Sequence, residues 1–263
     1  TYQNAYTVWM LPYSLIAVSV STAVFPVISR FLARNDIDGA RLELSKALRN
    51  VTVIMCFFAA LFAVMAVPIA KALLPSVTMH EAVLMSGPLT ALALCLPLSS
   101  AYLIIQRTFF AFEDGRHPFL FAILQNVAHV AILLAGVKML QPEHWVTWLG
   151  VTITASTLIA FPALITMLRR RFNGRLDGRR ISLSCAKAAL ASIISILVCR
   201  GLRPWILMLA GASKQAMNWF QSILICMILG LIAGSVYAVS LALLGSEELR
   251  SCVLALKSSF GRH

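Results

Sequence analysis

Charge is scarce in this sequence. Only 12% of the 263 residues are Asp, Glu, Lys or Arg, whereas 60% are hydrophobic. A soluble domain carries about 25% charged residues, so this composition excludes that class. The chain also lacks a starting Met and a signal peptide with a cleavage site, and we expect it to begin within a longer protein.

Motifs for catalysis and metal binding are missing as well. The six cysteines form no CxxC pair, and none lies near a histidine at metal-ligand spacing. No nucleophile–base pair or phosphate-binding loop is present, so we expect no enzyme, no metal and no cofactor. Glu113, Asp114 and His117 are interpreted as parts of a capped, solvated turn.

What the sequence does contain is long apolar runs, each suited to crossing a hydrocarbon core of about 30 Å. They predict an all-α polytopic membrane protein. Seven spans are expected at residues 6–29, 48–74, 84–110, 119–140, 145–167, 183–198 and 219–244. Bends are expected at Pro12, Pro26, Pro68, Pro97 and Pro162, because proline removes a backbone hydrogen bond.

Within the first run, Thr7, Ser14 and Ser21 recur at every seventh residue. This spacing predicts that they share one helix face, since a straight helix drifts by only about 20° per heptad. A small polar stripe suits a wall that lines a cavity. It equally suits tight helix packing, because small residues let backbones approach closely in membranes.

Lys and Arg are distributed unevenly between the two sides of this topology. One side carries Arg30, Arg34, Arg41, Lys46, Arg49, Arg107, Arg116, Arg169, Arg170, Arg171, Arg175, Arg179, Arg180, Lys187, Arg250, Lys257 and Arg262. The other side carries Lys71, Lys138, Arg200, Arg203 and Lys214. Because cytoplasmic loops are enriched in Lys and Arg, the N-terminus of this chain is expected outside and its C-terminus in the cytoplasm.

The tryptophans agree with this orientation, because all five fall at the expected outer ends of spans, where headgroups lie. They are Trp9, Trp145, Trp148, Trp205 and Trp219. The net charge of +12 then indicates anionic lipids at the cytoplasmic face and not nucleic acid. Residues 31–50 are expected to form a surface helix capped by Asn35 or Asp36.

Two stretches resemble a known family. FFAFEDGRHP, at residues 109–118, resembles the F-Y-A-x-x-D-x-x-x-P signature of the MurJ (MviN) lipid II flippases of the MOP exporter superfamily. LPYSLIAVSVSTAVFPVISR, at residues 11–30, is similar to the proline-containing helix of that family. The resemblance implies that the chain is the C-terminal half of a fourteen-helix flippase.

On this resemblance, residues 1–172 form the transmembrane bundle of the second lobe and 173–182 a basic cytoplasmic link. Residues 183–244 form the extra helix pair with a groove for the lipid tail, and 245–263 a cytoplasmic tail. The implied partners are the missing N-terminal lobe and the undecaprenyl-pyrophosphate-linked peptidoglycan precursor. The implied location is the bacterial inner membrane.

The resemblance implies flipping of this precursor from the inner to the outer leaflet by alternating access. The family has an Arg, thought to meet the pyrophosphate, at the position that Thr7 occupies here. Either the missing lobe supplies the anion contact alone, or the alignment is shifted. The alternatives are another MOP-type exporter, such as a polysaccharide-lipid flippase or a drug/cation antiporter, and a non-transporting scaffold for cell-wall enzymes.

Four further polar residues are candidates for the substrate cavity, because polar groups inside spans often mark a transport path. Gln125, Asn126 and His129 lie on adjacent positions of the fourth span, and they either line the cavity or bond to neighbouring helices. Arg107 lies at the cytoplasmic end of the third span, where it guards the inner mouth or extends to the headgroups.

Overall fold

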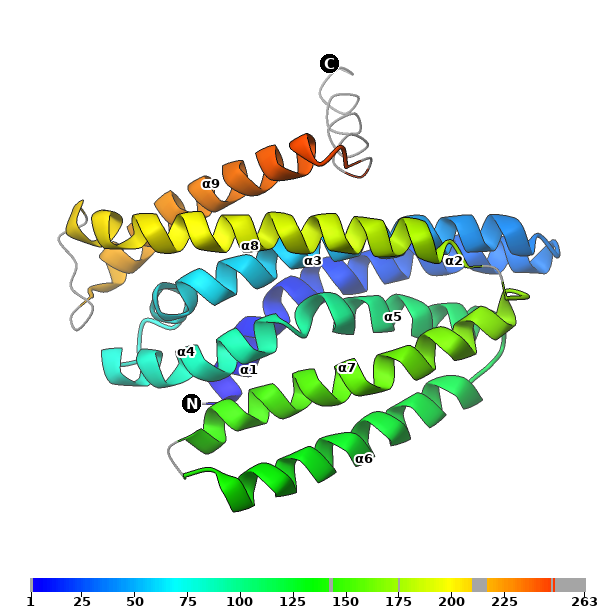
Figure 1. Cartoon of the computed structure of the whole chain (residues 1–263), viewed down its shortest axis with the longest axis horizontal. Coiled ribbons are helices and arrows are strands. Elements are labelled where there is room, and N and C mark those ends of the chain that lie inside the picture. The colour runs from blue at the N-terminus through cyan, green and yellow to red at the C-terminus, as the bar shows by residue number, and fades with distance from the viewer. Residues whose placement is uncertain (1, 142–143, 175, 210–216, 247, 249–263) are drawn as a thin grey trace.

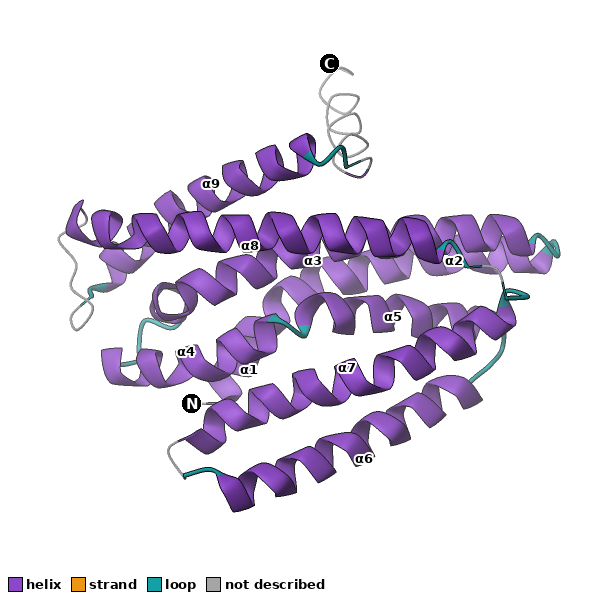
Figure 2. Ribbon diagram, in the orientation of Figure 1, coloured by secondary structure: helices purple, strands orange, loops and turns teal. Residues whose placement is uncertain are grey.

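The computed structural model describes residues 2–141, 144–174, 176–209, 217–246 and 248. The described residues form helices and connections and contain no strand (Figure 2). The elements in chain order are Tyr2–Pro12 (α1), Tyr13–Val18 (η1, a π-helix), Ser19–Ala33 (α2), Ile37–Leu73 (α3), Met79–Ala93 (α4), Leu96–Ala111 (α5), Arg116–Met139 (α6), Trp145–Arg171 (α7), Gly178–Leu209 (α8) and Trp219–Leu243 (α9). Six helices, counting α1–η1–α2 as one, can cross a membrane, and the bent pair α4–α5 makes seven. The expected all-α fold with about seven spans is confirmed.

Successive helices run back and forth between the two ends of the bundle (Figure 1). The α2–α3, α5–α6 and α7–α8 connections lie at one end, which we call the basic end. Among the described residues it carries Arg30, Arg34, Arg41, Arg107, Arg116, Arg169, Arg170, Arg171, Arg179 and Arg180. Arg175, Lys214, Arg250, Lys257 and Arg262 lie outside the described residues, as does most of the expected tail at 245–263.

The first span contains a π-helical segment in its middle. Pro12, which lacks a backbone N–H, is the last residue of α1, and η1 follows it directly. This wider turn breaks the heptad register, so Thr7 and Ser14 are exposed whereas Ser21 is buried. The expectation that these three residues share one face is therefore wrong, because it assumed a regular α-helix.

The central helix α3 begins at the basic end and continues without interruption as far as Met65. The Asp36 side chain caps it by accepting a hydrogen bond of 2.8 Å from the Gly39 N–H. The surface helix expected at 31–50 is thus not separate: its residues from Ile37 onward are the first turns of a span. The expected bend near Pro68 appears at Met65, whose dihedral angles are not helical.

The third span is broken into α4 and α5, which meet at an angle of 47°. Pro97 lies in the first turn of α5, where its missing N–H costs nothing. The next two helices, α6 and α7, pack as an antiparallel pair, and α6 forms the outer edge of the bundle (Figure 1). α7 runs through Pro162 to Arg171.

Close approach of α4 and α7 depends on glycine. A side-chain carbon at Gly150 would lie 2.9 Å from the Pro88 carbonyl oxygen and 3.0 Å from the Ala91 Cβ. Thr154, one turn further along α7, donates a hydrogen bond of 2.8 Å to the Ala91 carbonyl. Small residues in this contact let the two backbones approach, as in other membrane bundles.

The C-terminal pair, α8 and α9, packs on α3. The expected sixth span, 183–198, is too short, because α8 begins at Gly178 and ends at Leu209. The basic link expected at 173–182 is correspondingly shorter. α3 contacts α1, α2, α4 and α5 as well as α8 and α9, so it joins the pair to the rest of the bundle.

Three of the five tryptophans are well exposed, as a headgroup position requires: Trp145, Trp205 and Trp219. Trp9, in contrast, is buried and stacks between Tyr6 and Tyr13 with ring centroids 5.4 Å apart on each side. The Trp148 ring packs on Gly136 of α6 and occupies the space that a side chain at position 136 would need. Helix packing therefore explains these two tryptophans.

Candidate functional site

The exposed face of the first span carries several polar side chains among apolar ones such as Leu11, Leu15 and Val18. Gln3, Thr7, Ser14, Ser19 and Thr22 are all exposed. The four hydroxyl groups donate to carbonyl oxygens three or four residues earlier in the same helix. Their oxygen atoms remain able to accept hydrogen bonds from outside.

The exposed face of α6 is different in character. It presents Phe119, Ile123, Val127, Val130 and Leu134. An apolar exposed face suits lipid, whereas a polar face suits water or another polar surface. The exposed side of α6 therefore suits contact with lipid, whereas the first span also offers polar groups to its surroundings.

Ser21 is 1% exposed and donates a hydrogen bond of 3.0 Å to the Val18 carbonyl. Its hydroxyl group thus lies inside the bundle, where it satisfies a backbone acceptor. Sequence periodicity did not predict this position, because the π-helical turn changes the direction of the residues that follow it.

The polar residues of α6 point in different directions. Gln125 donates a hydrogen bond of 2.9 Å to Thr157 Oγ1 on α7, so it joins two helices. Asn126 is exposed and donates to the Ala122 carbonyl at 2.8 Å. His129 is half-buried. Arg107, near the end of α5, is exposed at the basic end.

An apolar hollow of about 580 Å³ lies beside the exposed polar face. Ser14 and Leu15 of η1 line it from one side, and Phe58 and Phe62 of α3 from the other. A second hollow, of about 240 Å³, lies between α3 and α9 and is lined by Phe57, Gly234 and Tyr237. Phe57 and Phe58 are neighbours in the chain, so the two hollows flank the same turn of α3.

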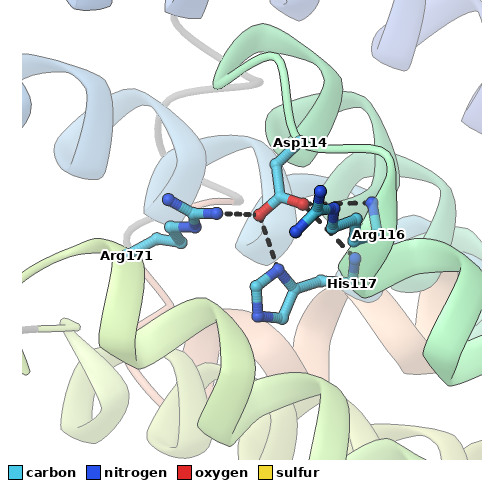
Figure 3. Close-up of polar contacts among 4 residues, drawn as sticks. All are labelled: Asp114, Arg116, His117 and Arg171. Atoms are coloured by element: carbon cyan, nitrogen blue, oxygen red, sulfur yellow. Dashed lines mark hydrogen bonds and ion pairs between the residues drawn. The ribbon is translucent and has the colours of Figure 1, made fainter.

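At the basic end, the α5–α6 turn holds a buried carboxylate, Asp114 (Figure 3). Its side chain accepts hydrogen bonds from the backbone N–H groups of Arg116 at 3.1 Å and His117 at 3.3 Å. His117 Nδ1 lies 2.5 Å from Asp114 Oδ2, and Arg171 Nη2 at the end of α7 contacts the same oxygen. The expectation of a solvated turn is wrong for Asp114, which is 5% exposed, and correct for Glu113.

Two opposing effects act on the Asp114 carboxyl. Burial raises its pKa, but the hydrogen bonds from His117 and Arg171 outweigh burial, so the pKa lies below its ordinary value. The carboxylate is therefore charged and holds the end of α7 against the α5–α6 turn. Phe112 and Phe172 pack edge to face across the same contact, with centroids 5.3 Å apart.

A related turn connects α2 to α3. Asn35 and Glu113 both have φ 57°, and the next residues, Asp36 and Asp114, each donate their N–H to a carbonyl five residues earlier. Each Asp then caps the following helix. Asp36, however, is exposed. The buried position of Asp114 therefore comes from the packing of α7 and not from the turn itself.

The segment after α9 is fastened to α3 and α8. Glu248 forms an ion pair of 2.8 Å with Arg49 on α3, and Ser246 donates to the same carboxylate at 2.9 Å. Lys187 on α8 donates to the Gly245 carbonyl at 2.9 Å. Burial raises the pKa of Glu248, but its hydrogen bonds and the charge of Arg49 lower it overall. Sequence patterns did not predict this ion pair, because its partners lie far apart in the chain.

Within the described ranges, no three His, Cys, Asp or Glu side chains come together as a metal site. Helix ends are joined by ion pairs and capped turns, and polar groups inside the bundle bond to neighbouring backbones. The fold and these contacts define the class of the molecule, a multi-pass helical membrane protein.

Comparison with known proteins identifies the family. The family model described as lipid II flippase MurJ matches residues 1–228, so the chain belongs to the MurJ lipid II flippase family. The resemblance recognised in the two motifs is thus confirmed. The description of the family names a flippase, which is a transporter.

The fold is similar to a solved structure of a lipid II flippase MurJ in an inward closed conformation. The TM-score is 0.65 and the sequence identity 20%, over 92% of this chain and 47% of that one. The chain therefore spans about half the length of that structure, in agreement with the expected half of a flippase. Among curated proteins, none matches the sequence.

Proposed function

We propose that this chain forms most of the second lobe and the C-terminal helix pair of a lipid II flippase. The whole protein moves the undecaprenyl-pyrophosphate-linked precursor from the inner to the outer leaflet by alternating access between two lobes. Membership in the MurJ family supports the substrate. The observation that carries the transport path is the set of exposed amide and hydroxyl side chains on α1–η1–α2.

In this proposal the polar face of the first span forms a wall of the cavity opposite the missing N-terminal lobe. Thr7 and Ser14 lie on it, and Arg107 lies at its inner mouth. A sugar-peptide headgroup needs polar partners at membrane depth, because unpaired polar groups are costly there. Gln125 serves as an interhelical contact, and Ser21 packs inside the bundle.

The pyrophosphate requires a cation, and the first span provides none between Tyr6 and Ser29. In the alignment that the two motifs suggest, Thr7 stands at the position where the family has an arginine. We therefore assign the anion contact to the missing lobe. The lobe formed by the present chain contributes hydrogen bonds from hydroxyl groups and the shape of the cavity.

The isoprenoid tail follows the two hollows on α3 in this proposal. The hollow between α3 and α9 opens beside Gly234, and the hollow beside η1 adjoins Ser14. Phe57 and Phe58 lie between them. The apolar walls suit a hydrocarbon chain, and the path ends next to the polar face, as an amphiphilic substrate requires.

The basic end faces the cytoplasm in this proposal, with the N-terminus of the chain outside. The concentration of arginines at that end supports this orientation. It also brings these arginines to the level of anionic lipid headgroups.

Depletion of the whole protein in cells tests the proposal. Exposure of the lipid-linked precursor on the outer leaflet is then measured with an impermeant probe that modifies its headgroup. We expect exposure to fall as the protein disappears and to recover when it is resupplied. Unchanged exposure would exclude the flippase and leave a scaffold for cell-wall enzymes, whereas loss of a different lipid-linked sugar would indicate another exporter.

A further inference from the structure

A further cavity lies on the other side of α8 from α9. Its volume is about 690 Å³, within the range of about 300–1,000 Å³ that is typical of ligand pockets. α3, α5, α7 and α8 surround it. Leu48, Ala101, Ile105, Phe161 and Ile165 are among its apolar lining residues.

The charged lining residues of this cavity in the described part of the chain are Arg169 and Arg179. Arg169 is in the last turn of α7 and Arg179 in the first turn of α8, so both lie at the basic end. Within the described ranges neither forms an ion pair, and Asp177 in the same connection pairs with neither. The Arg169 Nε donates to the Gly174 carbonyl at 2.8 Å, which orients the guanidinium and leaves its other N–H groups available.

An apolar cavity with a cationic rim matches one kind of molecule in a bilayer. Water does not fill an apolar cavity, and an empty one loses dispersion contacts along its walls. Hydrocarbon chains are the solvent at this depth. Basic pockets between helices near the membrane surface bind anionic lipid headgroups.

We propose that this cavity binds one anionic phospholipid of the adjoining leaflet. Its phosphate lies between Arg169 and Arg179, and one acyl chain fills the apolar part. The cavity separates α8 from α5 and α7, and the bound lipid fills this space and contacts all three helices. The leaflet is the cytoplasmic one if the proposed orientation holds, but the site itself does not depend on that orientation.

This site is distinct from the proposed path of the isoprenoid tail. Cys56 lines the cavity, whereas the next residue, Phe57, lines the hollow between α3 and α9. Successive residues of a helix point in different directions, about 100° apart. Two faces of α3 therefore serve two apolar sites.

Native mass spectrometry of the full-length, delipidated protein tests this proposal, with phosphatidylglycerol and phosphatidylcholine of identical chains as probes. We expect one phosphatidylglycerol to be retained at least tenfold more tightly than phosphatidylcholine. The double variant R169Q/R179Q should lose about tenfold in phosphatidylglycerol affinity, because two cations near the phosphate are removed. The matched control R170Q/R180Q removes the same charge from neighbouring positions outside the cavity and should bind as the wild type does.

A second pair of variants tests the acyl-chain part without changing charge. Ala189→Phe on α8 places a ring in the cavity and should abolish the retained lipid, whereas Ala186→Phe, at an exposed position of the same helix that does not line the cavity, should not. Equal losses in R169Q/R179Q and R170Q/R180Q, or full binding in Ala189→Phe, would overturn the proposal. Displacement of the retained lipid by equimolar undecaprenyl phosphate would also overturn it, since the cavity would then belong to the substrate. These measurements need no flipping activity, so they fail or succeed independently of the proposed function.

Discussion

The carboxylate of Asp114, in the turn between α5 and α6, contacts the guanidinium of Arg171 at the end of α7. Asp114 is buried, whereas the Arg171 side chain is 43% exposed. The contact thus joins three helix ends at the basic end of the bundle. A turn that looked solvated from its composition is in fact a point where tertiary structure is held together.

Replacing Asp114 should destabilise this end. Asp114→Ala removes both the cap of α6 and the partner of Arg171, and we expect a loss of about 2 kcal/mol in the free energy of unfolding. Thermal unfolding of the full protein in detergent measures it. The control Glu113→Gln alters the exposed neighbour and should change stability by less than about 0.5 kcal/mol. Equal effects of the two variants would contradict the assigned contact.

The same carboxylate predicts a pH dependence. Its pKa is lower in the folded than in the unfolded protein, so its stabilisation is present above the unfolded value of about 3.9 and is lost as pH falls through the folded value. The difference in melting temperature between wild type and Asp114→Asn should therefore stay constant from about pH 8 to pH 5. It should narrow below about pH 4. Narrowing between pH 7 and pH 5 would contradict the lowered pKa of Asp114.

Gly150 should be intolerant of a side chain. Gly150→Ala forces α7 away from the Pro88 carbonyl, and we expect a loss of about 1–3 kcal/mol in stability, as for other overpacked sites. Gly201→Ala on α8 is the control, because no neighbouring atom lies within 4 Å. It should be neutral or stabilising, by up to about 1 kcal/mol. Melting temperatures that rise in both variants would show that α4 and α7 are not in close contact.

The hollow between α3 and α9 can be tested by filling it. A side chain at Gly234 would meet the Phe57 ring, whereas one at Gly230 would meet no neighbour within 4 Å. Gly234→Leu should therefore lower the rate of precursor exposure on the outer leaflet several-fold, and Gly230→Leu should leave it unchanged. Expression of both variants in the membrane is checked by immunoblotting. Normal flipping in Gly234→Leu would remove this hollow from the proposed tail path.

Orientation can be measured with single cysteines. In a cysteine-free version of the whole protein, Lys138→Cys should react with an impermeant maleimide in intact cells. Glu113→Cys, on an exposed turn at the basic end, should react only after the membrane is opened. The reverse pattern would invert the proposed topology.

The seven apolar runs predicted where the membrane-spanning segments lie, because a span must have a minimum hydrophobic length, but they did not predict that the third is divided into α4 and α5. Their ends were less certain. The sixth span is longer than expected, since α8 continues past Arg200 and Arg203, whose charges interrupt the apolar pattern. The hydropathy pattern therefore predicted that the span ends before Arg200, although the backbone remains helical beyond it.

The sequence by itself determined the class of the protein and its family, and it offered Asp36 as one of two candidate caps of the helix that follows, because each depends on composition or on residues a few positions apart. Only the tertiary structure decided that Asp114 is buried and that Ser21 points inward. It also decided that Arg169 and Arg179 border one cavity. Those facts depend on a π-helical turn and on contacts between helices distant in the chain, and no periodic pattern in the sequence indicates either of them.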